Sequence, residues 1–335
     1  MAAGHPAQAE VRREIRRALR EVLGGAKGGQ SPLILAAVSG GADSLALAAG
    51  LAAEAAALGV RAGAVVVDHG LQTGSAGTAD TAAAQCRELG LDPVRIERVQ
   101  VDPIGEGVEA AARAARHDVL DRVAKESGSP FVLLGHTRDD QAEQVLLGLA
   151  RGSGARSLAG MPARRGRLLR PLLGVSRATT HAACAAWGLT PFADPMNEDP
   201  AFARVRARRA LADLEADLGP GLTEALSRSA DLLRVDADHL DGLARAALAP
   251  FASVAELPLA DLAALPTAVR TRVLRRLLLG RGARPGDLSA AHVAAVDRLV
   301  TGRRARGPLH LPGIRVSRVG KGADARLSIE AVAPV

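Results

Sequence analysis

The chain has 335 residues and a formal net charge of +7, and 48% of its residues are hydrophobic, which supplies a folded core and excludes general disorder. Aromatic residues make up only 1%, so the stacking surfaces that bind single-stranded nucleic acid are scarce. The two cysteines exclude a disulfide framework. Because the sequence shows neither a signal peptide nor a membrane-spanning run, we expect a soluble, cytoplasmic protein with no membrane partner.

The first 150 residues predict strands that alternate with helices. An amphipathic helix is expected from about Val11 to Leu23, where apolar residues recur every four positions. Buried strands are then expected at 33–38, 62–67, 94–101 and 131–134, with helices at 42–58, 108–125 and 139–150. This alternation predicts a parallel α/β sheet of the Rossmann-like kind, in which ligands bind beyond the carboxyl ends of the strands.

The second half of the chain is mostly helical in pattern. A helix is expected around 176–187, and the region 211–248 is helical with a break at 219–221. Helices near 259–265, 267–279 and 289–300 precede a terminal hairpin formed by 309–319 and 325–329. We therefore expect a catalytic α/β domain over 1–215, a helical connector over 216–249 and a small domain over 250–335.

A glycine-containing loop joins the first predicted strand to its helix. Its residues are Ser39, Gly40, Gly41, Ala42, Asp43 and Ser44. The glycines let the backbone approach an anion, and the first amides of the helix carry partial positive charge, so the loop is predicted to bind phosphate. Asp43 would repel phosphate unless a cation bridges the two, which indicates Mg²⁺. The loop lacks the Walker A and dinucleotide-binding patterns.

A second polar cluster follows the fourth predicted strand. His136 precedes Asp139, Asp140 and Glu143. Asp140 and Glu143 are three residues apart on one helix face, so together they could hold Mg²⁺ or receive an ammonium group. His136 could contact phosphate or transfer a proton. The alternative is structural, because acidic residues also stabilise the first turn of a helix.

The strand–loop–helix sequence Ser-Gly-Gly-x-Asp-Ser at 39–44 resembles the signature of the PP-loop ATP pyrophosphatases. Further segments resemble the tRNA(Ile)-lysidine synthetase family within that group: 136–161, 68–71, 109–117 and 194–208. The resemblance is strong over about 33–220, and it extends to the rest of the chain only in general pattern.

The resemblance implies a ligase that uses ATP and Mg²⁺. ATP adenylates the 2-carbonyl oxygen of the wobble cytidine in the CAU anticodon of tRNA(Ile), and free L-lysine then displaces AMP to form lysidine. The implied ATP site comprises the loop 39–44 and Asp68, which lies by the adenosine. Homodimer formation is left open.

The implied catalytic residues belong to both polar clusters. Asp43, with Mg²⁺, neutralises the leaving pyrophosphate, and Asp140 is the second candidate Mg²⁺ ligand. Asp140 and Glu143 position lysine or metal. Arg113 and His136 contact the activated intermediate.

Positive charge is concentrated in two tracts, which indicates a tRNA backbone as partner. Residues 151–210 hold 11 arginines against three acidic residues, and residues 270–318 hold 12 against two, so the remainder has a net charge of −11. The candidate tRNA-binding residues in the first tract are Arg151, Arg204, Arg206 and Arg208.

Two other functions stay open from the sequence. A tRNA-thiolating PP-loop enzyme would use cysteines to carry sulfur, but Cys86 and Cys184 lie in helical patterns without a CxxC motif, which favours packing. A catalytically inactive tRNA-binding protein is the other alternative, and the intact loop 39–44 argues against it.

Overall fold

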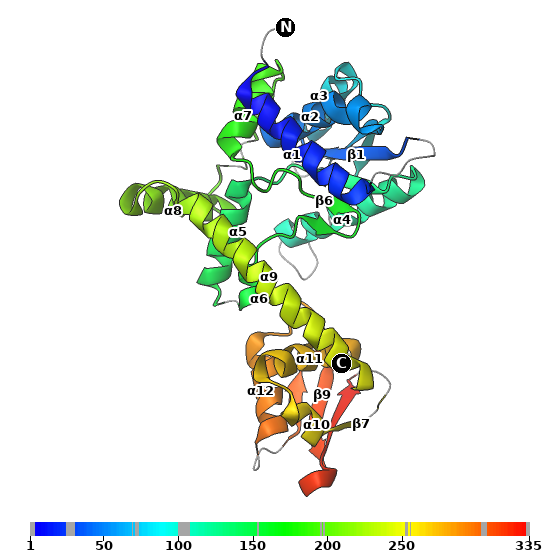
Figure 1. Ribbon diagram of the computed structural model, residues 1–335, viewed down its shortest axis with the longest axis vertical. Helices are drawn as coiled ribbons and strands as arrows, with labels where there is room; N and C mark the ends of the chain where they lie inside the picture. Colours follow the sequence, from blue (N-terminus) through cyan, green and yellow to red (C-terminus); the bar gives the residue numbers. More distant parts are fainter. Residues whose placement is uncertain are drawn as a thin grey trace. The chain divides into compact units, whose positions relative to one another are not determined.

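The computed structural model of this protein divides into two compact units (Figure 1). The first comprises Met1–Ala150 and Gly160–Ala230, and the second comprises Arg151–Ala159 and Asp231–Val335. The structure describes residues 4–24, 31–68, 70, 74–99, 108–152, 154–194, 196, 198–251, 254, 256–302 and 307–332, without the side chains of 108–114 and 323.

The first unit alternates strands and helices as predicted. Its elements are α1 (Pro6–Leu23), β1 (Leu33–Val38), α2 (Ala42–Leu58), β2 (Arg61–Asp68), α3 (Ser75–Glu88), β3 (Val94–Arg98), α4 (Val108–Glu126), β4 (Phe131–Leu134), α5 (Arg138–Ala150), β5 (Arg164–Arg165), β6 (Leu168–Leu169), α7 (Arg177–Ala186), α8 (Ala203–Leu218) and the start of α9 (Leu222–Leu248). β3 ends at Arg98, short of the expected Val101, and positions 100–101 lie outside the described residues. α8 begins eight residues before the expected helix, inside an arginine-rich stretch whose charges obscure the apolar period.

The six strands form one sheet in the order β3-β2-β1-β4-β6-β5. β3, β2, β1, β4 and β6 run parallel, and β5, which with β6 was not expected from the sequence, pairs antiparallel with β6. The chain builds outward from β1 to β3 and then returns to the other side of β1 as β4. The order therefore reverses between β1 and β4, and in such sheets ligands bind at that reversal.

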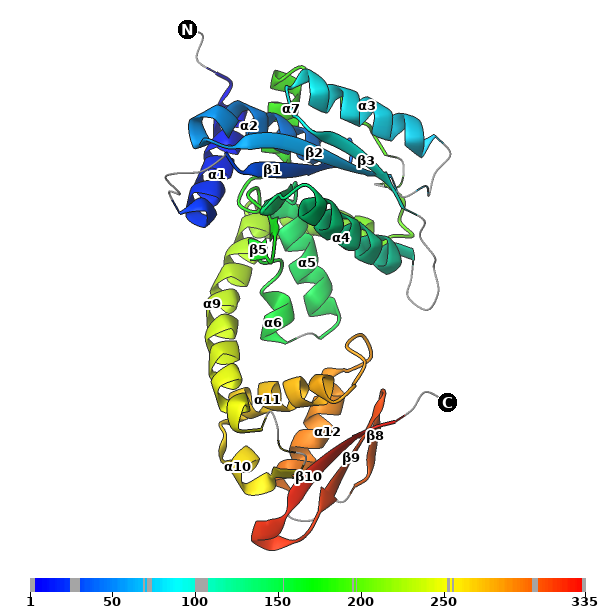
Figure 2. The ribbon, with the colours of Figure 1, turned by 90° about the vertical axis from the view of Figure 1, so that its right-hand side faces the viewer.

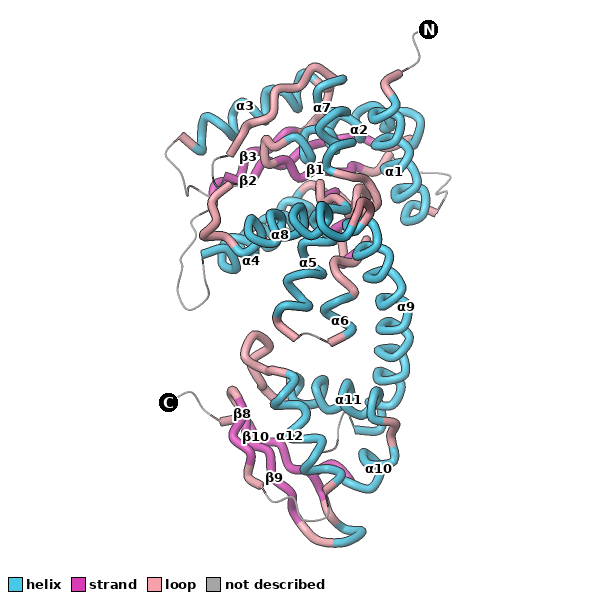
Figure 3. Tube along the Cα trace, turned by 90° about the vertical axis from the view of Figure 1, so that its left-hand side faces the viewer, coloured by secondary structure: helices cyan, strands magenta, loops and turns pink. Residues whose placement is uncertain are grey.

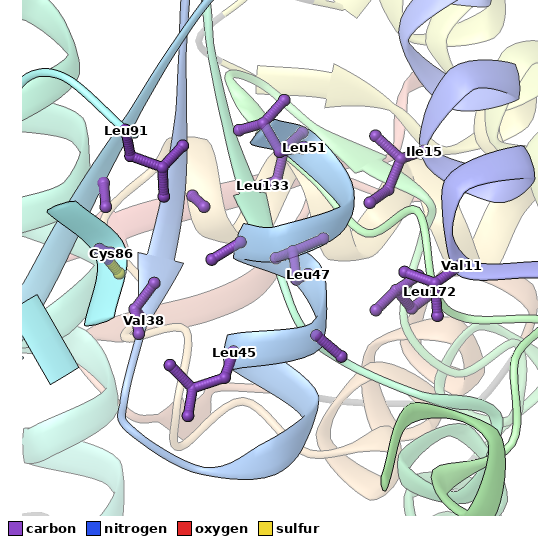
Figure 4. Packing of buried hydrophobic residues seen from close by; sticks show 14 of the residues in the cluster. Val11, Ile15, Val38, Leu45, Leu47, Leu51, Cys86, Leu91, Leu133 and Leu172 are labelled. Atoms are coloured by element: carbon purple, nitrogen blue, oxygen red, sulfur yellow. The ribbon is translucent and has the colours of Figure 1, made fainter. Parts of the chain in front are cut away.

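Both faces of this sheet are covered by helices (Figure 2). Alternate residues of β1 belong to different cores: Ile34 packs with α1, α2 and α7, whereas Leu35 packs with α4. Figure 4 shows the first core, in which Ile15 of α1 and Leu47 of α2 lie among other fully buried side chains. A continuously apolar strand such as β1 is what a parallel sheet buried on both faces requires.

A buried carboxylate fixes α1 against α2. The Glu54 side chain is fully buried, and its oxygens accept hydrogen bonds from the Nε atoms of Arg12 at 2.7 Å and Arg16 at 2.6 Å. The hydrogen bond from Arg16 and the charges of both arginines hold the pKa of Glu54 below its ordinary value, against the effect of burial. These two ion pairs hold α1 against α2.

The second unit contains a small helical layer and an antiparallel sheet (Figure 3). Its elements are α6 (Ala155–Leu158), the remainder of α9, a 3₁₀ turn (Ala249–Phe251), β7 (Glu256–Pro258), α10 (Leu259–Ala264), α11 (Thr267–Gly280), α12 (Ala290–Thr301), β8 (Leu309–Leu311), β9 (Ile314–Val319), a second 3₁₀ turn (Gly322–Asp324) and β10 (Arg326–Ala331). The sheet order is β7-β10-β9-β8, so the expected terminal hairpin is present. A turn at 312–313 splits its first arm into β8 and β9, and β7 adds a further strand beside β10.

The two units divide the chain at positions other than the expected domain boundaries, which stay a prediction. One division falls within α9 after Ala230, while the expected boundary at 215/216 falls within α8. The short segment 151–159 groups with the second unit, and its Arg156 pairs with Asp238 and Asp241 of that unit, both at 2.7 Å. Such side-chain pairs carry no periodic signal. In the part of the chain that the structure describes, no helix is both long and apolar enough to cross a membrane.

Replacement of the buried carboxylate tests how α1 is held. We expect Glu54→Ala to lower the free energy of unfolding by about 1–3 kcal/mol. The loss is smaller than for breaking a fully buried ion pair, because Arg12 and Arg16 are partly exposed and can be hydrated in the variant. Urea unfolding measures the change. Asp121→Ala, which removes an exposed pair with Lys125, is the control and should cost under about 0.5 kcal/mol. Equal effects of the two substitutions would contradict this role of Glu54.

Candidate active site

The loop between β1 and α2 has the geometry of an anion-binding turn. Gly40 has a φ of +84°, in the left-handed region that favours glycine, and Gly41 is the N-cap of α2 without a side-chain cap. The Ser44 hydroxyl accepts from the Ser39 amide at 3.1 Å and donates to the Gly41 carbonyl at 2.9 Å. The first turn of α2 therefore keeps amides that no side chain caps, as phosphate binding requires.

The end of β4 packs tightly against this loop. A Cβ atom built on Gly135 would lie 3.1 Å from the carbonyl carbon and oxygen of Asp43 and from the Cα atom of Ser44. Only glycine allows this approach without displacement of the backbone. The two polar clusters of the sequence, one after β1 and one after β4, are thereby brought together.

Asp43 is held by two residues of α7. The Thr180 hydroxyl donates to its Oδ1 atom, and the Arg177 Nε atom lies 3.7 Å from its Oδ2 atom. Burial raises the pKa of Asp43, and the nearby charge of Asp140 adds to the increase, while Thr180 and Arg177 act in the opposite direction. A cation near Asp43 would therefore be bound favourably.

Asp140 and Glu143 share the same arginine. The Arg177 guanidinium donates to Asp140 at 2.9 Å and to Glu143 at 3.2 Å. Asp140 also accepts from the Thr137 amide at 2.7 Å and from its hydroxyl at 3.0 Å. Although burial favours the neutral acid, the Arg177 charge and these hydrogen bonds lower the pKa of Asp140, so it is a carboxylate at neutral pH.

Sequence reasoning missed Arg177, which is the centre of the cluster. Its backbone amide donates to Asp139 at 2.7 Å, so four carboxylates lie around one residue. Ser176 caps α7 by accepting from the Thr179 amide, which places Arg177 in the first turn. The only signal in the sequence was a serine followed by an arginine at a helix start, a pattern that ordinary capping also produces.

A cavity of about 160 Å³ adjoins the cluster within the first unit. Its charged lining residues are Asp139, Glu143, Arg177, Arg208 and Glu215, and the remaining lining comes from α8 and the start of α9. The Oε1 atom of Glu143 accepts from Arg208 Nε at 2.8 Å. The Oε2 atom is buried and has no hydrogen-bond partner among the described residues. Glu143, which lines the cavity, thus has one buried carboxylate oxygen that the described residues leave without a partner.

The remaining predicted catalytic and ATP-site residues lie after β4, at the end of β2 and in α4. His136 follows β4, and its charge helps to lower the pKa of Asp140. Asp68 ends β2, accepts from the Gly70 amide at 3.0 Å and lies 3.6 Å from Arg98 Nε. The backbone of Arg113 lies in α4, but its side chain is outside the described residues.

The four candidate tRNA-binding arginines differ in their surroundings. Arg151 is exposed just after α5, and Arg204 is half-buried in α8. The Arg206 guanidinium donates to the carbonyls of Pro200 and Ala201 at 2.7 and 2.8 Å. Arg208 contacts Glu143 and therefore belongs to the carboxylate cluster.

Cys86 and Cys184 are both buried, in α3 and α7 respectively. Burial raises the pKa of both thiols to about 11. A thiol that stays protonated at neutral pH is a poor sulfur carrier, and both side chains pack in the core as expected.

The sequence matches two family models. Residues 8–215 match the PP-loop domain, and residues 257–320 match the TilS substrate binding domain. The two models thus cover the α/β region and the C-terminal region, respectively.

The chain is also similar, over most of its length, to known tRNA(Ile)-lysidine synthases. The chain is 55% identical over 288 residues to a tRNA(Ile)-lysidine synthase of Thermobifida fusca, with 85% of this chain and 89% of that protein covered. It is 54% identical over 293 residues to the tRNA(Ile)-lysidine synthase of Streptomyces coelicolor, with 86% and 83% covered.

Among solved structures, the U34-tRNA thiolase NcsA of Methanococcus maripaludis is similar in fold. Its TM-score is 0.54 at 22% identity, covering 68% of this chain and 79% of that one. The likeness concerns the fold alone. On the sequence matches, the chain belongs to the tRNA(Ile)-lysidine synthase family of PP-loop enzymes.

Proposed function

We propose that this chain forms lysidine at the wobble cytidine of a tRNA(Ile) with a CAU anticodon, using ATP and free L-lysine. The observation that carries the proposal is the convergence of Asp43, Asp140 and Glu143 on Arg177 beside a polar cavity and a phosphate-type loop. The loop serves the activation step, and the cavity serves the second substrate.

In the first step, the cytosine 2-carbonyl oxygen bonds to the α-phosphorus of ATP, and the bond from that phosphorus to the bridging oxygen breaks. The uncapped amides at the start of α2 would stabilise the charge on the departing pyrophosphate. They do so without reorganisation, because the loop is fixed by Ser44.

Asp43 is the residue we assign to Mg²⁺. No group of three or more histidine, cysteine, aspartate or glutamate side chains in the described residues could hold a metal by itself. Mg²⁺ in nucleotide sites usually takes one or two protein carboxylates and completes its shell with phosphate and water, so Asp43 fits that requirement. Both oxygens of Asp140 are already hydrogen-bonded, which makes it the weaker of the two candidates. When bound, Mg²⁺ would supply positive charge to the leaving pyrophosphate.

In the second step, the ε-amine of lysine bonds to C2 of cytosine, and the C2–O bond to AMP breaks. The cavity suits this substrate: three carboxylates and two arginines line it, giving a net charge of −1 against the +1 of lysine. The free Oε2 atom of Glu143 can accept from an ammonium group. Asp140 stays a carboxylate because its pKa is lowered, and it acts through Arg177, which it contacts and which lines the cavity. His136 is the neighbouring group we assign to proton transfer.

tRNA binding is assigned to arginines of the two basic tracts, but some arginines of these tracts have a structural role. Arg270 pairs with Asp297 at 2.6 Å and Arg272 with Asp241 at 3.1 Å, so both arginines support the second unit. The exposed Arg151 is better placed to meet phosphate, and Arg204 and Arg206 remain candidates. Homodimer formation also remains a prediction.

The function is tested by incubating the protein with ATP, Mg²⁺, lysine and transcripts carrying CAU anticodons, followed by mass analysis of the nucleosides. We expect lysine in the isoleucine tRNA and none in the methionine tRNA. Asp43→Asn should lower the rate of pyrophosphate release at least 100-fold, because it removes the charge that binds Mg²⁺. No modification of either tRNA would refute the proposal.

Replacement of Glu143 tests the lysine site. We expect Glu143→Gln to raise the KM for lysine at least tenfold, because the amide cannot pair with the ammonium charge, while the KM for ATP stays within twofold. Steady-state kinetics measures both values. Glu224→Gln, at an exposed glutamate paired with Arg138, is the matched control and should leave the KM for lysine unchanged. An unchanged KM for lysine in the Glu143 variant would exclude this assignment.

A further inference from the structure

The chain has five aromatic residues, and their burial singles out one of them. All five lie in the described part of the chain. Phe131 and Phe251 are buried, and Trp187 and Phe202 are half-buried. Phe192 is 42% exposed. Phe192 is therefore the most exposed of the five aromatic residues, and its neighbours decide whether this exposure has a use.

Phe192 lies directly beside the phosphate loop. Its backbone amide donates to the Gly40 carbonyl at 2.9 Å, and its Cβ atom would lie 3.8 Å from a Cβ atom built on Gly40. Because Gly40 is the left-handed residue of the loop, the base of the Phe192 side chain is fixed relative to the loop backbone.

The segment before Phe192 is also anchored. The Gln85 side chain of α3 donates to the Thr190 carbonyl at 3.0 Å and accepts from the Thr190 amide at 2.9 Å. Two hydrogen bonds to α3 and one to the loop hold the backbone, while the ring itself stays exposed. A rigid backbone that presents an exposed ring is suited to binding, since little conformational entropy is lost when a ligand covers the ring.

The proposed reaction brings one nucleobase directly to the α-phosphorus of ATP. When the 2-carbonyl oxygen of cytosine bonds to the α-phosphorus, only that oxygen separates the base from the phosphate. A ribose separates the adenine of ATP from the same phosphorus. The base that must come closest to the α-phosphorus is therefore the wobble cytosine.

We propose that Phe192 is the stacking surface for the wobble cytosine while it is activated at the phosphate loop. The inference rests on the proposed function. Stacking on a ring is the usual way in which proteins hold a single unpaired base, and it fixes the plane of the base. With that plane fixed, the 2-carbonyl oxygen can be directed at the α-phosphorus.

Fluorescence tests the contact without requiring catalysis. The chain has one tryptophan, so F192W in a W187F background carries a single reporter. Titration uses a CAU anticodon stem–loop RNA, the same RNA with an abasic wobble position, and ATP alone. We expect strong quenching by the intact RNA and little by the abasic RNA. Equal quenching by both RNAs, or quenching by ATP alone, would overturn the proposal, the latter in favour of adenine.

Kinetics tests what the contact contributes. We expect F192A to raise the KM for tRNA about tenfold, with the KM for ATP within twofold. F192L, which keeps an apolar side chain of similar size, should not restore the KM, whereas F192W should. L218A, at another exposed apolar residue, is the control. Full restoration by F192L would reduce Phe192 to a packing role. Failure of the proposed function would instead appear as absence of lysidine from the wild-type reaction.

Discussion

The Arg177 guanidinium is the interaction on which the candidate site depends. It lies 3.7 Å from Asp43, 2.9 Å from Asp140 and 3.2 Å from Glu143, and these carboxylates come from helices that follow two different strands. Without a cation among them, three partly buried carboxylates would repel one another, and some would take up protons. The Arg177 charge lowers the pKa of Asp140 and opposes the rise in the pKa of Asp43, and its contacts hold the three side chains in one place. The carboxylates in turn raise the pKa of Arg177, although burial acts to lower it.

The fold delivers these groups by two separate routes. The reversal of strand order between β1 and β4 places the phosphate loop beside the start of α5, and Gly135 lets the two backbones approach. α7 arrives from elsewhere in the chain: it packs against α1 and α2 through a buried face that includes Ala183 and Cys184. That packing brings Arg177 and Thr180 to Asp43. A change in the α1–α2–α7 core should therefore be felt at the active site.

Much of this architecture follows from the periodicity of apolar residues and from the glycine and serine residues that end the apolar runs. β1 and β4 have the predicted bounds because each is a short apolar run ended by glycine or serine, and the phosphate loop is readable for the same reason. β5 and β6 were not predicted, because each strand has only two residues, too few to show an alternating pattern. The segment 151–159 groups with the second unit, to which it is joined by arginine–aspartate pairs between positions some 80 residues apart.

The sequence pattern predicted the carboxylates of the candidate site but not the arginines that pair with them. Acidic residues at strand ends point to a ligand edge, and Asp43, Asp140 and Glu143 do lie together. Arg177 and Arg208 belong to an arginine-rich tract that net charge alone assigns to tRNA, yet their guanidinium groups are used inside the site. Charge counts along a sequence do not distinguish arginines that neutralise buried carboxylates from arginines that face solvent.

A double-mutant cycle on Arg177 and Asp140 tests the central claim most directly. Single-turnover rates of pyrophosphate release and of lysine transfer would be measured for Arg177→Met, Asp140→Asn and the combined variant. If Arg177 unites the cluster, Arg177→Met slows both steps, and adding Asp140→Asn then slows lysine transfer by less than it does in the wild-type background. Independent effects that multiply, or pyrophosphate release at the wild-type rate in Arg177→Met, would contradict the account.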